Sequence, residues 1–171
     1  QVGLDPNFYT NKASTLIGNI LTISIQSDNK ILIGGDGANF EGVNYGKIIR
    51  LNANGTLDNT FQSSVGANGI VRCITILDNG KIIIGGDFSE YNGVAVNKIV
   101  RLNSDGTIDP TFSVTGNFNN AVNKIVEDPL THGLYVTGFF TEFDSANVGG
   151  IVKLNEEGSK NTLFNVGTGA D

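Results

Sequence analysis

The sequence predicts an all-β fold in which one unit of roughly 52 residues is repeated three times. The first observation is that Lys81–Asp87 returns almost unchanged as Lys30–Asp36, and that Ile82–Phe88 returns recognisably as Leu134–Phe140. The second is a set of evenly spaced closing aromatic residues: Phe8, Phe61, Phe112 and Phe164. The third is that every copy consists of short β-branched segments separated by turn residues, with no apolar spacing typical of a helix.

The second copy shows the first half of the unit most clearly. Ile74-Thr75-Ile76 alternates apolar and polar residues, as a half-buried strand does. Asp78-Asn79-Gly80 supplies residues that tolerate the positive φ of a tight hairpin. Lys81–Ile84 is a continuous apolar run, which predicts a strand buried on both faces.

The second half of the unit predicts a longer polar connection and two more strands. The connection is Ser89–Gly93, and the third strand is Ile99–Asn103. A turn at Ser104–Gly106 then leads into a short fourth strand, Thr107–Asp109. Four short antiparallel strands in a tandem unit are typical of a β-propeller blade, whose two faces are covered by neighbouring blades.

Paired glycines follow the second strand and are predicted structural positions, because they allow close backbone approach or a β-bulge. The glycines concerned are Gly34, Gly35, Gly85, Gly86 and, in the third copy, Gly138 alone.

The repeat resembles the delta-60 family of β-propeller repeats. The resemblance rests on Asn79–Phe88 and on Arg101–Phe112, and it extends over nearly the whole chain. The third copy departs from the pattern at Thr137, Lys153 and Asn161. The resemblance implies a bacterial surface or secreted protein, or a phage tail or virion component, and therefore an extracellular, cell-surface or virion location. It brings no catalytic residues.

The chain is predicted to form a single repeat domain, residues 1–171. Residues 1–8 match the end of a unit and are predicted to supply a closing strand. The three blades are then expected at about 9–61, 62–112 and 113–171. Single-chain propellers usually have four to eight blades. Three blades therefore predict a homo-oligomer that completes a ring, a slice of a longer propeller, or another closure of the same strands.

The composition excludes several function classes. The net charge is −6, and the 11 basic residues are scattered, so neither nucleic acid nor an anionic membrane surface is an expected partner. Apolar runs are too short to insert in a membrane. The single cysteine, Cys73, cannot form an internal disulfide.

The loops after the paired glycines carry aromatic residues beside acidic and amide side chains, a mixture that suits carbohydrate binding. The candidate binding residues are Phe40, Asn44, Tyr45, Tyr91, Asn92, Asn97, Phe143, Asp144 and Asn147. The alternative is that the rings at this repeat position fill the gaps between blades.

A cation recurs inside the third strand of every copy, as Arg50, Arg101 and Lys153. One hypothesis is a ring of cations that lines a channel or binds acidic sugars. The other is a structural ion pair with Asp58 and Asp109 of the same copies. Recurrence in each copy favours the structural role.

We expect no catalytic residues, no metal and no cofactor. His132 is the only histidine and lies in a turn, and Cys73 lies in a strand without a nearby histidine. Turns such as Asn103–Asp109 resemble calcium loops but lack the full ligand spacing.

Three functions remain open. The first is a non-catalytic, adhesion-type interaction module that presents loops to a glycan or protein receptor. The second is a purely structural repeat of a fibre, tail or surface assembly. The least favoured is a carbohydrate-active hydrolase whose site is incomplete in this sequence.

Overall fold

The computed structural model describes residues 18–37, 39–40, 43–62 and 65–165. These residues form three three-stranded antiparallel sheets and three two-stranded sheets, and no helix. The first strands of the three large sheets are β1 (Ile20–Ile25), β6 (Val71–Ile76) and β11 (Val122–Glu127). The second strands are β2 (Ile31–Gly35), β7 (Ile82–Gly86) and β12 (Leu134–Gly138). The third strands are β5 (Ile48–Leu51), β10 (Ile99–Leu102) and β15 (Ile151–Leu154). The all-β prediction is confirmed.

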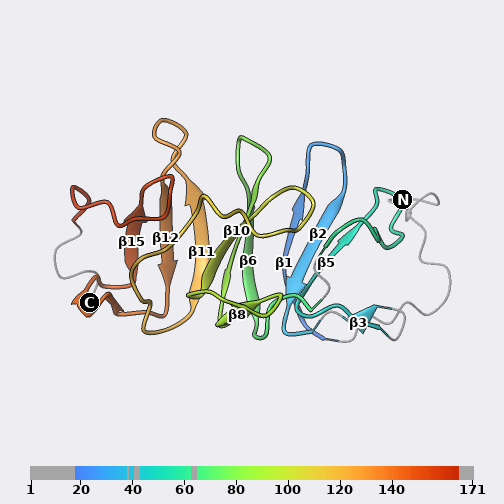
Figure 1. Ribbon diagram of the computed structural model, residues 1–171, viewed down its shortest axis with the longest axis horizontal. Coiled ribbons are helices and arrows are strands. Elements are labelled where there is room, and N and C mark those ends of the chain that lie inside the picture. The colour runs from blue at the N-terminus through green and yellow to red at the C-terminus, as the bar shows by residue number, and fades with distance from the viewer. Residues whose placement is uncertain (1–17, 38, 41–42, 63–64, 166–171) are drawn as a thin grey trace, which may run out of the picture.

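The three large sheets lie side by side in an open row (Figure 1). We call the sheet β1-β2-β5 blade 1, the sheet β6-β7-β10 blade 2 and the sheet β11-β12-β15 blade 3. Strand β6 packs against both β1 and β11, so blade 2 is covered on both faces. One blade lies in each predicted residue range, whereas the proposed closing strand at 1–8 lies outside the described residues.

The expected fourth strand is reduced to one bridge in each blade. Leu102 pairs with Ile108 in blade 2, and the same bridge recurs in the other two blades. The Asp109 carboxylate then accepts hydrogen bonds from the backbone N–H and the hydroxyl of Thr111, at 3.0 and 2.7 Å. This local turn ends the extended conformation, so the four-stranded blade of the prediction is a three-stranded sheet with a bridged edge.

Each connection after the paired glycines contains a miniature hairpin that the sequence analysis treated as a loop. The hairpin strands are β3 (Asn39–Phe40) with β4 (Val43–Asn44), β8 (Glu90–Tyr91) with β9 (Val94–Ala95), and β13 (Glu142–Phe143) with β14 (Ala146–Asn147). Asn92 and Gly93 both have positive φ between β8 and β9. An Asn-Gly pair between apolar residues is a strong signal for such a turn.

The cores lie between blades. One apolar cluster joins blades 1 and 2 and includes Leu32, Ile48, Val71, Ile74 and Tyr91. A second joins blades 2 and 3 and includes Ile83, Ile99, Val122, Ile125 and Phe143. Burial on both faces explains why the second and third strands are continuous apolar runs.

The two glycines of each pair have different roles. A Cβ atom at Gly34 would lie 2.7 Å from Cγ1 of Val71, and one at Gly85 would lie 2.6 Å from Cγ1 of Val122. The first glycine therefore receives a side chain of the following blade. A Cβ atom at Gly86 would instead overlap the carbonyl oxygen of Ile70 in the same blade. There a β-bulge shifts the register of the first strand.

Blade 3 keeps only the second glycine. A Cβ atom at Gly138 would overlap the carbonyl oxygen of Ala121, just as at the matching positions of the other blades. Thr137 takes the place of the first glycine and lies on the face of blade 3 that points away from blade 2. The departure seen in the sequence therefore coincides with the end of the row.

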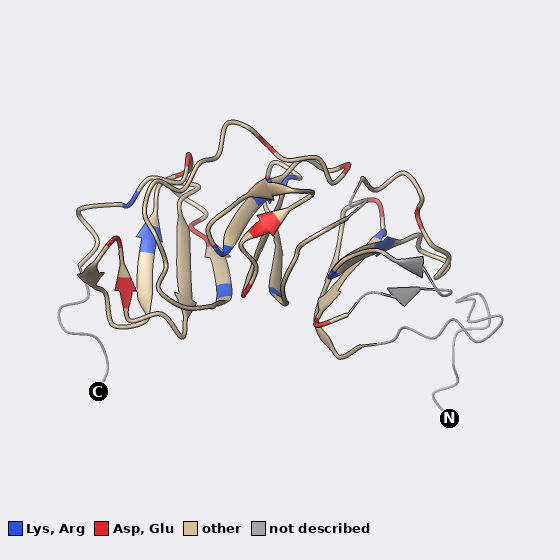
Figure 2. Ribbon diagram, turned by 60° about the horizontal axis from the view of Figure 1, so that its bottom comes forward, with Lys and Arg blue, Asp and Glu red and all other residues tan. Residues whose placement is uncertain are grey.

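Basic and acidic residues are both distributed along the three blades (Figure 2). The described residues contain no helix that is long and apolar enough to cross a membrane.

We predict that Gly85→Ala destabilises the protein by about 1–3 kcal/mol, because the added methyl group overpacks the contact with Val122 and Ile125. Thr137→Ala, at the matching position of blade 3, is the control and should change stability by less than about 0.5 kcal/mol. Urea unfolding of both variants measures the difference. Equal stability of the two variants would contradict the assigned role of the first glycine.

Candidate functional site

The aromatic rings proposed for ligand stacking are core residues where the structure describes them. Tyr91 is 0% and Phe143 is 1% exposed. The Tyr91 hydroxyl donates a hydrogen bond to the carbonyl oxygen of Gly106 at 3.0 Å. Phe143 packs edge-on against Phe118, with ring centroids 4.8 Å apart. Neither ring offers a face to a ligand, so their placement corrects the stacking hypothesis and agrees with the gap-filling alternative.

Two of the candidate amides hold the backbone of the connecting segments. The Asn92 side chain accepts from the N–H of Gly66 at 2.9 Å and donates to the carbonyl oxygen of Gln62 at 2.9 Å. The Asn97 amide donates to the carbonyl oxygen of Gly116, which precedes blade 3. These side chains join segments distant in sequence, so their hydrogen-bonding capacity is used within the fold.

The remaining candidates divide into three groups. Asp144 and Asn147 are exposed, and Asn147 accepts a hydrogen bond from the N–H of Gly149 at 3.0 Å. Tyr45 is half-buried against the apolar cluster of blade 1. Phe40 and Asn44 lie in β3 and β4, of which only the backbone is described.

The recurring arginines are buried and paired. The Arg50 Nε donates to Asp58 at 2.7 Å, and the Arg101 Nε donates to Asp109 at 2.6 Å. Each guanidinium also lies 4.8 Å from the centre of a closing aromatic ring, Phe61 for Arg50 and Phe112 for Arg101. The closing aromatic thus caps an ion pair.

The same arginines link consecutive blades. Arg50 donates to the carbonyl oxygen of Ser104 in the turn of blade 2. Arg101 donates to the carbonyl oxygen of Glu156 in the turn of blade 3, at 2.6 Å. This geometry is that of a structural cation, with each guanidinium bound to its own blade and to the next.

Each buried carboxylate also binds the lysine that precedes the second strand. Lys30 lies 3.1 Å from Asp58, and Lys81 lies 2.8 Å from Asp109. Burial favours the neutral form of Asp109, but hydrogen bonds from Lys81, Thr111 and Arg101 hold the pKa of its carboxyl well below the ordinary range. The pKa of Asp58 is lowered in the same way, against burial, by Thr60, Lys30 and Arg50. Both lysine head groups are therefore partly exposed and at the same time paired with a buried carboxylate.

Blade 3 has a different pairing. Lys153 binds Asp128 at 2.6 Å and the hydroxyl of Tyr135 at 3.1 Å. Hydrogen bonds from Lys153 lower the pKa of the Asp128 carboxyl, and the same bonds raise the pKa of Lys153. These contacts of Lys153 all lie within its own blade, in contrast to those of the two arginines.

Asp78, Glu127 and His132 meet at the turns of blades 2 and 3, with their ligand atoms within 4.8 Å of one another. Nδ1 of His132 lies 3.1 Å from Glu127, and this hydrogen bond raises the pKa of the imidazole. Glu127 also accepts from the backbone N–H of Asp78 at 2.8 Å. These groups could hold a metal ion, and the sequence analysis missed them because it sought only histidine or cysteine partners for His132. The contacts present join the turns of two blades.

Cys73 is buried beside Gly85, and burial raises the pKa of its thiol to about 12. A thiol held neutral in this way is a poor nucleophile. This placement fits a core residue.

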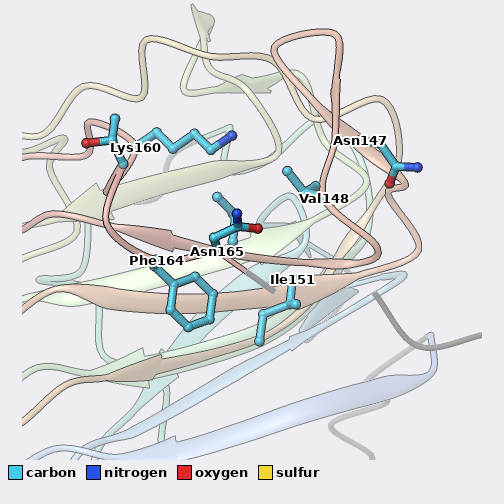
Figure 3. Close-up of a pocket in the computed structure, with 8 residues that line it drawn as sticks. Asn147, Val148, Ile151, Lys160, Phe164 and Asn165 are labelled. Atoms are coloured by element: carbon cyan, nitrogen blue, oxygen red, sulfur yellow. The ribbon is translucent and has the colours of Figure 1, made fainter. Parts of the chain in front are cut away.

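A pocket of about 280 Å³ lies on blade 3 (Figure 3). Its lining residues are Asn147, Val148, Ile151, Val152, Lys160, Thr162, Phe164 and Asn165. Of the candidate binding residues, Asn147 is the one that lines it. The pocket therefore brings one predicted residue together with an aromatic ring and a cation that sequence reasoning did not assign to it.

The most exposed apolar surface of a described strand is on β1. Ile20, Ile23 and Ile25 are 51%, 62% and 64% exposed, and we call these three side chains the β1 face. The matching residues of β6 are Val71, Ile74 and Ile76, of which Val71 and Ile74 are buried against blade 1. The sequence signal for this surface was present in Ile23-Ser24-Ile25, but strand alternation alone does not tell which blade lacks a neighbour.

Two segments of the chain, residues 26–61 and 77–112, match the model of a family described as "Domain of unknown function (DUF5122) beta-propeller". Each match begins before the second strand and ends at a closing aromatic, so these two segments are similar to β-propeller repeats of that family, and the predicted fold class is confirmed. The match supports neither a specific activity nor the delta-60 name, which stays a prediction. Comparison with curated proteins finds no relative.

We predict that Tyr91→Ala lowers the free energy of unfolding by about 3–5 kcal/mol, because it leaves a cavity between blades 1 and 2. Tyr91→Phe should cost about 1 kcal/mol, since only the hydrogen bond to Gly106 is lost. Chemical denaturation gives both values. A Tyr91→Ala variant with wild-type stability would restore the ring as a candidate ligand contact.

We predict that Asp109→Asn destabilises the protein by about 3–5 kcal/mol at pH 7, because Arg101 is left buried without its counter-ion. The folded-state pKa of Asp109 is lowered, so its stabilising contribution is complete above about pH 5 and is lost as the pH falls below about 4. The variant should therefore lose less stability than the wild type between pH 5 and pH 3.

The control for this comparison is Asp87→Asn, which removes a half-exposed pair with Arg72. It should cost at most about 1 kcal/mol. Unfolding curves recorded across the pH range test both variants, and equal costs for the buried and the half-exposed pair would rule out the assigned role of Asp109.

Proposed function

We propose that this chain is a non-catalytic β-propeller interaction module that binds a protein partner through the β1 face. The observation that carries the proposal is the exposure of Ile20, Ile23 and Ile25 at positions whose counterparts in β6 lie against another blade. Exposed apolar side chains that form a contiguous patch mark interaction surfaces. Leu21 of the same strand is also exposed.

The non-catalytic part of the proposal is supported by the state of the reactive groups. The carboxylates of Asp58 and Asp109 are bound by arginine and lysine, and Cys73 is buried. A carbohydrate-active hydrolase needs two carboxyl groups facing a substrate. Asp58 and Asp109 instead lie in different blades, and each is paired with cations of its own blade.

A structural role in a fibre, tail or surface assembly is compatible with the same surface, because a module that binds other blades builds an assembly. We also propose an extracellular, cell-surface or virion setting and association with further copies of the repeat. The support for the setting is the resemblance of the repeat motifs to the delta-60 family.

Carbohydrate binding is the second candidate function, and the pocket of Figure 3 is the observation that favours it. Asn147 offers an amide, Lys160 offers a cation, and Phe164 offers a ring in one concave surface. Amides and aromatic rings are the groups that recognise sugar hydroxyls and apolar sugar faces.

We predict that the wild-type chain associates weakly and reversibly as its concentration rises, because burying the β1 face removes apolar surface from water. The double substitution Ile23→Asp and Ile25→Asp should abolish this association without lowering the melting temperature. Sedimentation velocity over a range of concentrations measures the association. The matched control is Val94→Asp and Leu163→Asp, which changes two exposed apolar residues elsewhere.

Association that survives in the β1-face variant would overturn the proposal, as would a wild-type chain that stays monomeric at every concentration. Deletion of residues 1–17 tests whether the chain itself covers the face. A large fall in melting temperature together with stronger association would assign the β1 face to that segment and overturn the proposal. Glycan binding that is unaffected by the β1-face variant but lost with Asn147→Ala would favour the second candidate.

A further inference from the structure

The two junctions inside the row use the same three contacts. A branched side chain enters the space above the first glycine, as Val71 does at Gly34 and Val122 does at Gly85. A hydroxyl of the first strand donates to a carbonyl of the next first strand, from Ser24 to Ile74 and from Thr75 to Ile125, each at 2.8 Å.

The third contact is the arginine of one blade on the turn carbonyl of the next, from Arg50 to Ser104 and from Arg101 to Glu156. All three contacts have a direction along the row. Each blade contributes the glycine, the hydroxyl and the arginine to its follower, which supplies the branched side chain and two carbonyls.

Blade 1 has the residues that the following blade supplies at the two internal junctions. Ile20 and Ile23 occupy the positions of Val71 and Ile74 in the repeat, and their side chains are exposed. Ala53 occupies the position of Ser104, in a turn exposed in the same way. A preceding blade could therefore dock on blade 1 with the geometry of the two internal junctions.

Blade 3 lacks the residues that the preceding blade supplies at the two internal junctions. Thr137 stands where the first glycine would be, and Val126, which is 50% exposed, stands where the hydroxyl of Ser24 or Thr75 would be. Lys153 replaces the arginine and binds Asp128 in its own blade. Since a Cβ atom at Gly85 would already lie 2.6 Å from Val122, the side chain of Thr137 blocks the same approach.

We propose that the row of blades binds a further blade at the blade 1 end and not at the blade 3 end, which we call the closed end. The β1 face binds the outer face of a β-propeller blade that has glycine at the first position of the pair and arginine in the third strand. It does not bind the blade 3 face of a second copy in this geometry. The partner surface is thus a regular blade of the same repeat, and Thr137, Val126 and Lys153 prevent head-to-tail stacking of copies. The weak association expected of the wild-type chain is therefore contact between the β1 faces of two copies. A polar outer face on a terminal repeat is how repeat arrays limit further stacking. This inference rests on the proposed function of the β1 face.

The first test supplies a regular blade within the chain. Residues 62–112 are duplicated after Phe8, which keeps the repeat in phase because Phe8, Phe61 and Phe112 are equivalent. The matched control carries Gly85→Thr in the duplicated copy only. We expect the glycine version to melt at least about 4 °C above the threonine version, since only glycine admits Ile20. Equal melting temperatures would overturn the inference.

The second test gives the outer face of blade 3 the residues that the preceding blade supplies at an internal junction. The substitutions are Thr137→Gly, Val126→Thr, Lys153→Arg and Asn161→Asp. This variant should associate head-to-tail at least tenfold more tightly than the wild type in sedimentation experiments, and adding Ile23→Asp should reverse the gain. Thr137→Gly alone, which is the least disruptive change, should give part of the gain if the fourfold variant does not fold.

The outcomes separate the two proposals. If the wild type and the restored-face variants associate equally weakly and Ile23→Asp still abolishes that association, the proposed function stands and the closed end is wrong. If Ile23→Asp has no effect on any variant, the β1 face is not an interaction surface, and both proposals fail.

Discussion

The contact on which the rest of the structure depends is the close approach of one blade to the first glycine of the blade before it. At Gly34 and Gly85 the missing side chain lets Val71 and Val122 reach the backbone of the neighbouring sheet. The cores on either side of blade 2 form around these contacts, since Ile74 and Ile125 pack beside the same glycines. Without this approach the sheets would be held further apart and the apolar strands would lose close packing.

The polar contacts add direction to this packing. A buried arginine is costly unless it is paired, and here Arg101 has Asp109 in its own blade and the carbonyl of Glu156 in the next. Its guanidinium is therefore satisfied only when the next blade is in place. The same arrangement at Arg50 makes each junction a combination of apolar contact, ion pair and backbone hydrogen bond.

Much of this fold was predictable from the sequence, because tandem repetition turns local patterns into an architecture. The apolar run Ile82–Ile84 and the turn at Asn79-Gly80 indicated strands, and recurrence in register favoured the pairing of Arg101 with Asp109 over a ring of cations. The fourth strand was overestimated because β-branched residues in Thr107-Ile108 do not show that the Asp109 carboxylate turns the chain.

The candidate site was predicted less well than the fold, for a physical reason. An aromatic residue beside polar ones, such as Tyr91 or Phe143, gives the same pattern whether its ring faces solvent or a neighbouring blade. Which face of a blade is left uncovered depends on the number and order of blades, which no local pattern contains. The exposed face of β1 and the altered face of blade 3 became visible only when equivalent positions were compared in space.

Hydrogen–deuterium exchange at low and high protein concentration tests the central claim most directly, because it locates the surface that becomes buried. The account predicts that added protection on concentration is confined to β1, with β6 and β11 protected equally at both concentrations. Protection that appears in the hairpins β8–β9 and β13–β14 while β1 stays unchanged would contradict it and would return the search for the partner surface to the loops.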